Sequence, residues 1–134
     1  MKKYLVVTGI ALLSLSNVGY VNAVNVVDEL LLEYGSPGNF SAEAGETLWS
    51  QKFIDAKTGN IRQCTTCHTD DLRKEGKHAR TGKIIKPLAP SVNPERLTDI
   101  KKIRKWLKRN CKWTLGRECN SQEKGDILTF IRTQ

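Results

Sequence analysis

The sequence predicts an all-α fold in one small domain. Apolar residues recur at helical spacing over residues 95–109, which indicates a helix that buries one face. Ser41, and Asn120 followed by Glu123, are typical helix starts, because their side chains bond to free backbone N–H groups. No stretch alternates apolar and polar residues over the length of a strand, as a half-buried strand would.

The N-terminal segment is expected to be a secretory signal peptide. Two lysines precede an apolar run over residues 4–15, and Val21 and Ala23 form a small-residue cleavage pattern, so cleavage is expected after Ala23. The alternative is an uncleaved membrane anchor, but spanning a bilayer takes about 20 apolar residues and this run is shorter. Residues 24–134 are then expected to form a single domain in the periplasm.

Two helices are expected in the first part of this domain. NVVDELLLEYG predicts a short helix that ends at Gly35, and SPGN predicts a turn, since glycine and proline interrupt helices. Ser41 is the expected cap of a second helix over about 42–53, which DAKTGN ends. The apolar contacts of this helix are expected to be Leu48, Trp49 and Phe53.

The second part is expected to hold a long loop and two helices. Three prolines and two glycines over 76–94 favour an extended loop, because both residue types disfavour a helix. The helix over 95–109 has an expected apolar stripe of Leu97, Ile100, Ile103, Trp106 and Leu107. The last helix has expected core residues Ile127, Leu128, Phe130 and Ile131. Gly45 and Gly125 are expected where the first and last core helices cross, since glycine lets backbones approach.

The string CTTCH, at residues 64–68, is typical of covalent haem attachment, because two thiols at this spacing react with the two haem vinyl groups. Cys64 and Cys67 are the expected thioether residues, and His68 is the expected axial ligand of the iron. The other ring nitrogen of His68 is expected to donate to a backbone carbonyl of the segment KPLAP. One haem c is therefore the expected cofactor, and the order of helices and loops is that of class I c-type cytochromes.

Two further cysteines, Cys111 and Cys119, leave an alternative to weigh. A zinc site could use all four cysteines, but zinc ligands usually come in pairs spaced by about two to four residues. Cys111 and Cys119 lie farther apart. In an oxidising compartment unused thiols tend to pair, so a disulfide between these two residues is expected.

The second face of the iron needs another ligand. Methionine is a common one, but Met1 is the single methionine and leaves with the signal peptide. The residues alone leave four alternatives: His78, a lysine, an open coordination position and Asn110. His78 lies soon after His68 in a basic loop, and a lysine would need a neutral amine held away from water. Asn110 is expected to end the preceding helix, beside Cys111, as asparagine often does.

Several strings, in order, resemble the SHP (sphaeroides haem protein) family of c-type cytochromes. They are CTTCH, RTGKIIKPLAPSVNPERLTD, KWLKRNC, LGREC and EKGD, within about 41–131. The resemblance implies that Asn110 is the second axial ligand, opposite His68, beside the Cys111–Cys119 disulfide. It also implies that Asn110 leaves the iron on reduction, that O2 binds at the vacated position, and that a dihaem cytochrome c donates the electron. A neutral amide oxygen also suits Fe(III) better than Fe(II).

A basic stretch, KKIRKWLKRNCK at residues 101–112, dominates the charge pattern of a chain whose net charge is +8. Such a run is often only a solvated helix face, and the alternative is a docking surface for an acidic partner. The candidate docking residues are Lys101, Lys102, Arg104, Lys105, Lys108 and Arg109. Nucleic-acid binding is not expected, because the motifs and aromatic ladders of such proteins are missing from the sequence.

These patterns favour a periplasmic monohaem cytochrome that accepts electrons and then binds a diatomic ligand such as O2, NO or CO. One alternative is a plain electron carrier whose iron never opens to a ligand. Another is a small haem enzyme, such as a peroxidase or a nitric oxide dioxygenase. A peroxidase needs a distal acid–base group, and His78 is the remaining histidine that could serve as one. No residue is assigned a catalytic role.

Overall fold

The structure, a computed structural model, describes residues 25–134. The expected signal peptide and its cleavage site after Ala23 lie outside the described residues. Within the described range, no helix combines the length and the apolar composition that crossing a membrane requires.

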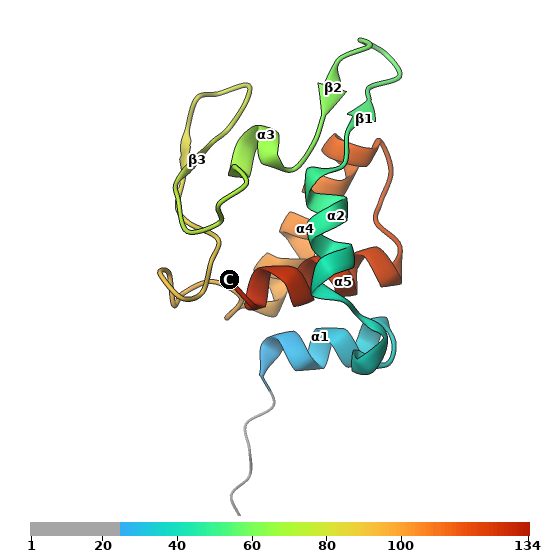
Figure 1. Ribbon diagram of the computed structural model, residues 1–134, viewed down its shortest axis with the longest axis vertical. Helices are drawn as coiled ribbons and strands as arrows, with labels where there is room; N and C mark the ends of the chain where they lie inside the picture. Colours follow the sequence, from blue (N-terminus) through green and yellow to red (C-terminus); the bar gives the residue numbers. More distant parts are fainter. Residues whose placement is uncertain (1–24) are drawn as a thin grey trace, which may run out of the picture.

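Residues 25–134 fold into helices joined by loops and two short hairpins (Figure 1). The helices are α1 (Val26–Tyr34), α2 (Ala42–Ser50), α3 (Thr65–His68), α4 (Ile100–Leu115) and α5 (Ser121–Arg132), with a 3₁₀ turn, η1, at Pro37–Asn39. The hairpins pair β1 (Phe53–Ile54) with β2 (Ile61–Arg62), and β3 (Gly76–Lys77) with β4 (Ile84–Ile85). The all-α prediction is confirmed, although the two hairpins were not expected. The first of them explains why α2 ends before residue 53.

Helices α2 and α5 cross at Gly45, where α2 lies in front of α5 in Figure 1. A Cβ atom at Gly45 would overlap the carbonyl oxygen of Asp126 on α5, so glycine permits this close approach. The buried Asp126 carboxylate also accepts a hydrogen bond from Ser41 N at 2.8 Å. The prediction for Gly45 is confirmed. Gly125 lies beside Asp126 at this crossing, but the atoms that its missing side chain makes room for belong to the ring of Phe40.

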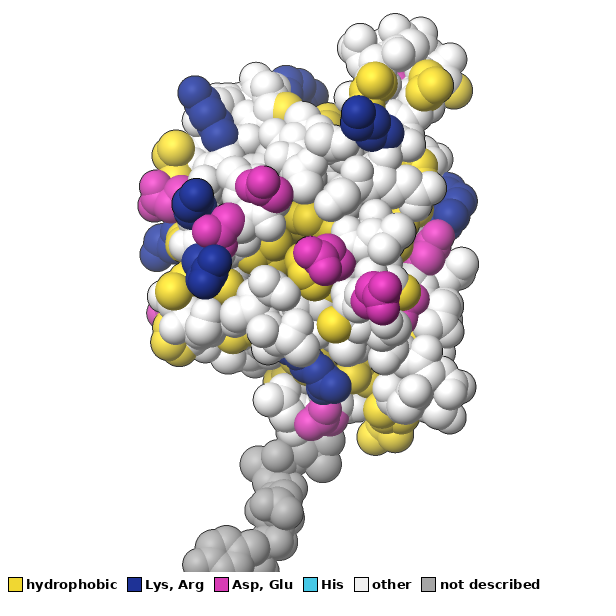
Figure 2. All heavy atoms as spheres, viewed as in Figure 1, with side chains coloured by type: hydrophobic (Ala, Val, Ile, Leu, Met, Phe, Trp, Pro, Cys, Tyr) yellow, Lys and Arg dark blue, Asp and Glu magenta, His cyan; other side chains and the backbone are white. Residues whose placement is uncertain are grey.

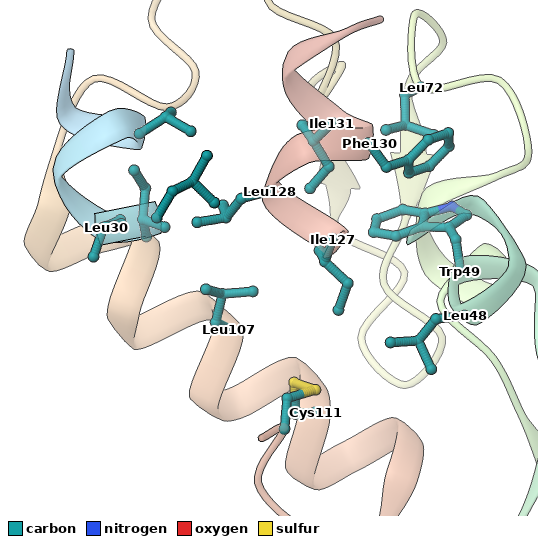
Figure 3. Packing of buried hydrophobic residues seen from close by; sticks show 14 of the residues in the cluster. Leu30, Leu48, Trp49, Leu72, Leu107, Cys111, Ile127, Leu128, Phe130 and Ile131 are labelled. Carbon is teal, nitrogen blue, oxygen red and sulfur yellow. A yellow bond between two sulfur atoms is a disulfide. The ribbon is translucent and has the colours of Figure 1, made fainter. Parts of the chain in front are cut away.

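The apolar core lies between α1, α4 and α5 and extends to α2. Figure 3 shows Leu30, Leu107 and Leu128, from α1, α4 and α5, gathered in one cluster. On the α2 side, the ring centroids of Trp49 and Phe130 are 5.9 Å apart. The predicted core residues of α5 are all buried: Ile127, Leu128, Phe130 and Ile131. Burial of one such side chain contributes roughly 1.5–3 kcal/mol, so this cluster is the framework that holds the loops around it.

Helix α4 begins and ends later than the sequence predicted. Leu97 has a φ of 59°, a left-handed conformation that an α-helix does not contain. Asp99 caps the helix instead, and its carboxylate accepts from Lys102 N at 3.0 Å. Gly116, with a φ of 75°, ends it. Asn110 therefore lies inside α4, and the prediction that it ends a helix is wrong.

Candidate haem site

The CTTCH motif forms α3, a single helical turn with Cys64 at its N-terminal cap and His68 as its last residue. The thiols of Cys64 and Cys67 are free and half-buried. Burial raises the pKa of Cys64 to about 11, and a hydrogen bond with Thr114 of α4 opposes this rise. The contact with Thr114 joins the motif to α4.

The imidazole of His68 packs against α2. Its ring lies 5.5 Å from the ring of Trp49, and the Trp49 indole N–H donates to the carbonyl oxygen of Thr69 at 3.1 Å. Burial, followed by the charges of Arg96 and His78, lowers the pKa of His68 to about 4. At neutral pH the ring is therefore uncharged, which is the form that binds a metal.

Gly76 in β3 lies directly against the motif. A Cβ atom at this position would overlap the carbonyl oxygen of Cys67 and would lie 3.0 Å from the Cα atom of His68. Beyond β3, the backbone N–H of Ala79 donates to Cys67 Sγ at 3.4 Å. The β3–β4 hairpin thus covers one side of α3, and it can do so because residue 76 has no side chain.

The expected hydrogen bond between His68 and the KPLAP segment does not form. His68 Nδ1 is buried and has no hydrogen-bond partner within residues 25–134. The carbonyl oxygen of Pro87, in that segment, accepts from Asn93 Nδ2 at 2.9 Å and from Arg96 Nε at 2.8 Å. This prediction is wrong for the structure, because two other donors already use both lone pairs of that oxygen.

His78 serves as a turn residue of the second hairpin. Its Nδ1 atom accepts from the backbone N–H groups of Arg80 at 3.3 Å and Thr81 at 3.2 Å. Its own backbone N–H donates to the carbonyl oxygen of Lys83 at 2.8 Å. These bonds hold the ring against its own turn.

Asn110 is exposed on α4, although the side chains one turn before and one turn after it on the same face are buried. It follows Leu107 by three residues and precedes Thr114 by four, so the three side chains share one face. Leu107 and Thr114 are buried, whereas Trp106 and Trp113, one turn before and after Asn110, are 47% and 36% exposed. Large apolar side chains gathered on a surface commonly mark a site that another group covers.

The residue next to Asn110, Cys111, forms a disulfide with Cys119, with an S–S distance of 2.00 Å. This pairing rules out the four-cysteine zinc alternative. In addition, the described part of the chain has no cluster of three or more His, Cys, Asp or Glu side chains that could hold a metal ion. The disulfide ties the loop after α4 to the helical turn that contains Asn110.

The residues present fit a covalently attached haem. Two free thiols and an uncharged imidazole lie on one helical turn, which are the groups that haem c requires. The partly exposed ring of Trp113 on α4 offers apolar surface for a macrocycle. The structure thus brings Cys64, Cys67 and His68 together on α3. It places Asn110 and Cys111 on α4, and Cys119 in the loop that follows. The contact between Cys64 and Thr114 links the two groups.

Three residues that shape this site were missed by the sequence analysis. Trp49 was expected only as a core contact, Gly76 only as part of a loop, and Arg96 only as part of a helix. The position of Gly76 soon after the haem motif was a usable signal. Trp49 bonds to Thr69, 20 positions later in the chain, and Arg96 bonds back to Pro87 in the preceding loop. No local pattern marks either contact.

Comparison with known proteins relates this site to a family. Residues 36–131 match the family described as "Domain of unknown function (DUF1924)". The chain is 43% identical over 103 residues to cytochrome c-type protein SHP of Cereibacter sphaeroides, covering 75% of this chain and 74% of that protein. It is 36% identical over 90 residues to cytochrome c″ of Methylophilus methylotrophus, covering 67% of this chain and 62% of that protein.

Solved structures agree with these relationships. Oxidised cytochrome c″ from Methylophilus methylotrophus aligns with a TM-score of 0.71 and 30% identity, over 84% of this chain and 97% of that chain. Oxidised SHP, an oxygen-binding cytochrome c, aligns with a TM-score of 0.70 and 38% identity, over 81% of this chain and 96% of that chain. The chain therefore belongs to the SHP family of c-type cytochromes, as its motifs predicted.

Proposed function

We propose that this protein is an exported monohaem cytochrome whose axial ligation depends on its redox state. Cys64 and Cys67 attach one haem c, and His68 binds one face of the iron. Asn110 binds the opposite face in the oxidised protein and leaves it on reduction. The observation that supports this most is the exposed position of Asn110 between buried residues of α4, one turn from the residue that contacts Cys64.

The haem supplies an iron that exchanges one electron and binds diatomic gases when a coordination position is free. The residues of the chain decide when that position is free. Burial keeps His68 neutral, and Trp49 holds the turn that follows it through the bond to Thr69. The amide oxygen of Asn110 is a hard, neutral donor that prefers Fe(III) to Fe(II), so it holds the reduced iron weakly.

Relatives support the finer parts of this proposal. SHP is an oxygen-binding cytochrome c, and a solution structure of cytochrome c″ from Methylophilus methylotrophus addresses the structural basis of haem-ligand detachment. The ligand of the reduced protein is accordingly a diatomic gas such as O2 or NO. The electron donor that the resemblance of the motifs implies is a dihaem cytochrome c. The N-terminal signal, cleaved after Ala23, delivers the domain to the periplasm.

Absorption spectra of the haem-loaded protein test the proposal. The oxidised protein should be six-coordinate, and the reduced protein should be five-coordinate, high-spin and ready to take up CO. Asn110→Ala should open the oxidised site to water or azide, whereas Asn110→Met should keep both redox states six-coordinate. Asn39→Ala is a matched control, because the Asn39 side chain is exposed on η1, before α2, and away from α4.

Two outcomes contradict the proposal. If Asn110→Ala leaves the oxidised spectrum unchanged, another residue is the ligand, with His78 and the lysines as the alternatives. If the reduced wild-type protein stays low-spin and ignores CO, the protein is a plain electron carrier.

A further inference from the structure

Three of the six candidate docking cations are already paired with carboxylates inside the molecule. The pairs are Lys102 with Asp99 (3.6 Å), Lys108 with Glu118 (3.5 Å), and Arg104 with Glu33 of α1. Glu118 also binds Lys112 at 3.2 Å, so Lys108 shares this carboxylate. Exposed pairs of this kind contribute little to stability. They nevertheless matter for recognition, because the neighbouring carboxylate cancels much of the field that a partner would feel.

The other three cations form one continuous stripe. Lys101, Lys105 and Arg109 follow each other at intervals of four residues, so they lie on one face of α4. All three are exposed, and none forms an ion pair within the described range 25–134. Trp106 borders the stripe, with Lys105 Nζ 5.6 Å and Arg109 Cζ 5.0 Å from its ring centroid.

One end of this stripe, at Arg109 and the bordering Trp106, carries residue types that are common at protein interfaces. Tryptophan and arginine are enriched among the residues that dominate binding energy at such interfaces. Arg109 lies over the ring of Trp106, which is itself nearly half exposed, so a partner could contact an aromatic surface and a cation together. Uncompensated positive charge at three successive turns selects a partner surface rich in carboxylates.

The stripe also lies beside the proposed haem site. Trp106 precedes Asn110 by one turn, and Arg109 is the residue directly before it. The face that carries α2 and α5 has a different charge pattern, because Figure 2 shows acidic and basic side chains interspersed there. A donor that docks on the stripe would thus be held close to the iron, whereas the mixed face offers no patch of a single sign.

We propose that Lys101, Lys105 and Arg109, with Trp106 at their edge, are the docking surface for an electron-donating protein with an acidic patch. This inference rests on the proposed function, since it assigns the place where the electron enters. The stripe attracts the acidic patch over a distance and orients it, which raises the association rate. Contact with Trp106 then excludes water from that part of the interface.

Stopped-flow reduction of the haem-loaded protein by reduced flavodoxin, an acidic one-electron donor, tests the proposal. Two triple variants each remove three exposed positive charges that form no ion pair within residues 25–134, K101Q/K105Q/R109Q from the stripe and K52Q/K57Q/K83Q from segments outside α4. At low ionic strength the stripe variant should lower the second-order rate constant about tenfold, within the range of electrostatic steering. The variant with the three charges removed outside α4 should lower it less than about twofold. High salt should remove the difference, since it screens exposed charges.

Several results would overturn this assignment. Equal slowing in the two variants would mean that only net charge matters, and no slowing in either would mean that the stripe does not dock the donor. Binding to phosphatidylglycerol vesicles that is lost only in the stripe variant, with unchanged flavodoxin rates, would assign the stripe to a membrane surface instead.

Two further measurements separate docking from the haem site itself. Reduction by photoreduced lumiflavin, a small neutral donor, and CO binding by the reduced protein should be the same in both variants. A change in the stripe variant alone would mean that the stripe acts on the haem site, which contradicts docking. If even the wild-type protein fails to bind CO, the proposed function is wrong, but the flavodoxin comparison still decides whether the stripe docks an acidic donor.

Discussion

Replacing Cys111 and Cys119 by alanine should lower the free energy of unfolding by about 2.5 kcal/mol. The two residues are separated by 8 positions in the sequence, and the chain-entropy model gives about 2.5 kcal/mol at 25 °C for closing a loop of that size. Both cysteines are 3% exposed, so the small cavity left by the two sulfur atoms should add to this loss.

The same variant separates the stability of the fold from the position of Asn110. Asn110 lies inside α4, and the buried side chains of Leu107 and Thr114 on either side of it anchor that part of the helix. The disulfide is therefore not needed to keep Asn110 in place. The absorption spectrum of the oxidised haem-loaded variant should match that of the wild-type protein under native conditions.

Urea unfolding, followed by circular dichroism, measures the loss in unfolding free energy. The two proteins are compared where their unfolding free energy depends on urea concentration with the same slope. Gly38→Ala is a suitable control, because a Cβ atom there meets no other atom within 4 Å. A loss below about 0.5 kcal/mol would refute the entropic argument. A changed oxidised spectrum would refute the argument that α4 alone positions Asn110.

Two glycine substitutions test the packing that surrounds the site. Gly45→Val should destabilise the protein by more than about 2 kcal/mol, because the new side chain overlaps the Asp126 carbonyl at the crossing of α2 and α5 and overpacking is destabilising. If urea unfolding shows the same stability for this variant as for Gly38→Ala, the two helices can move apart at little cost. Gly76→Ala should displace Cys67 and tilt the His68 ring, because its Cβ overlaps the Cys67 carbonyl. The haem absorption bands should then shift and CO should bind the reduced protein at a different rate, and spectra identical to the wild type would contradict this contact.

The helix caps show what local sequence can determine. Ser41 caps α2, and Asn120 caps α5 in a capping box with Glu123. These bonds join residues within three positions of each other, so the residue types alone predict them. The same holds for CTTCH, whose spacing places two thiols and an imidazole on a single turn.

The start of α4 shows where local sequence was insufficient. Pro94 and Glu95 are acceptable first residues of a helix, and so is Asp99 as a cap. The tertiary structure decides between them, because Arg96 donates to Pro87 O of the preceding loop and Leu97 is left-handed. The helix also ends later than predicted, at Leu115, so Asn110 lies inside it.

The sequence by itself determined the family, the haem motif, the pair of cysteines left for a disulfide and the cations of residues 101–112. Only the tertiary structure decided which of those cations remain uncompensated, since Arg104 is paired with Glu33 of another helix. It also decided that Trp49 packs on His68, and that Asn110 is exposed between buried neighbours. The physical reason is that charge compensation and burial depend on residues far apart in the chain, whereas caps and attachment motifs depend on neighbours.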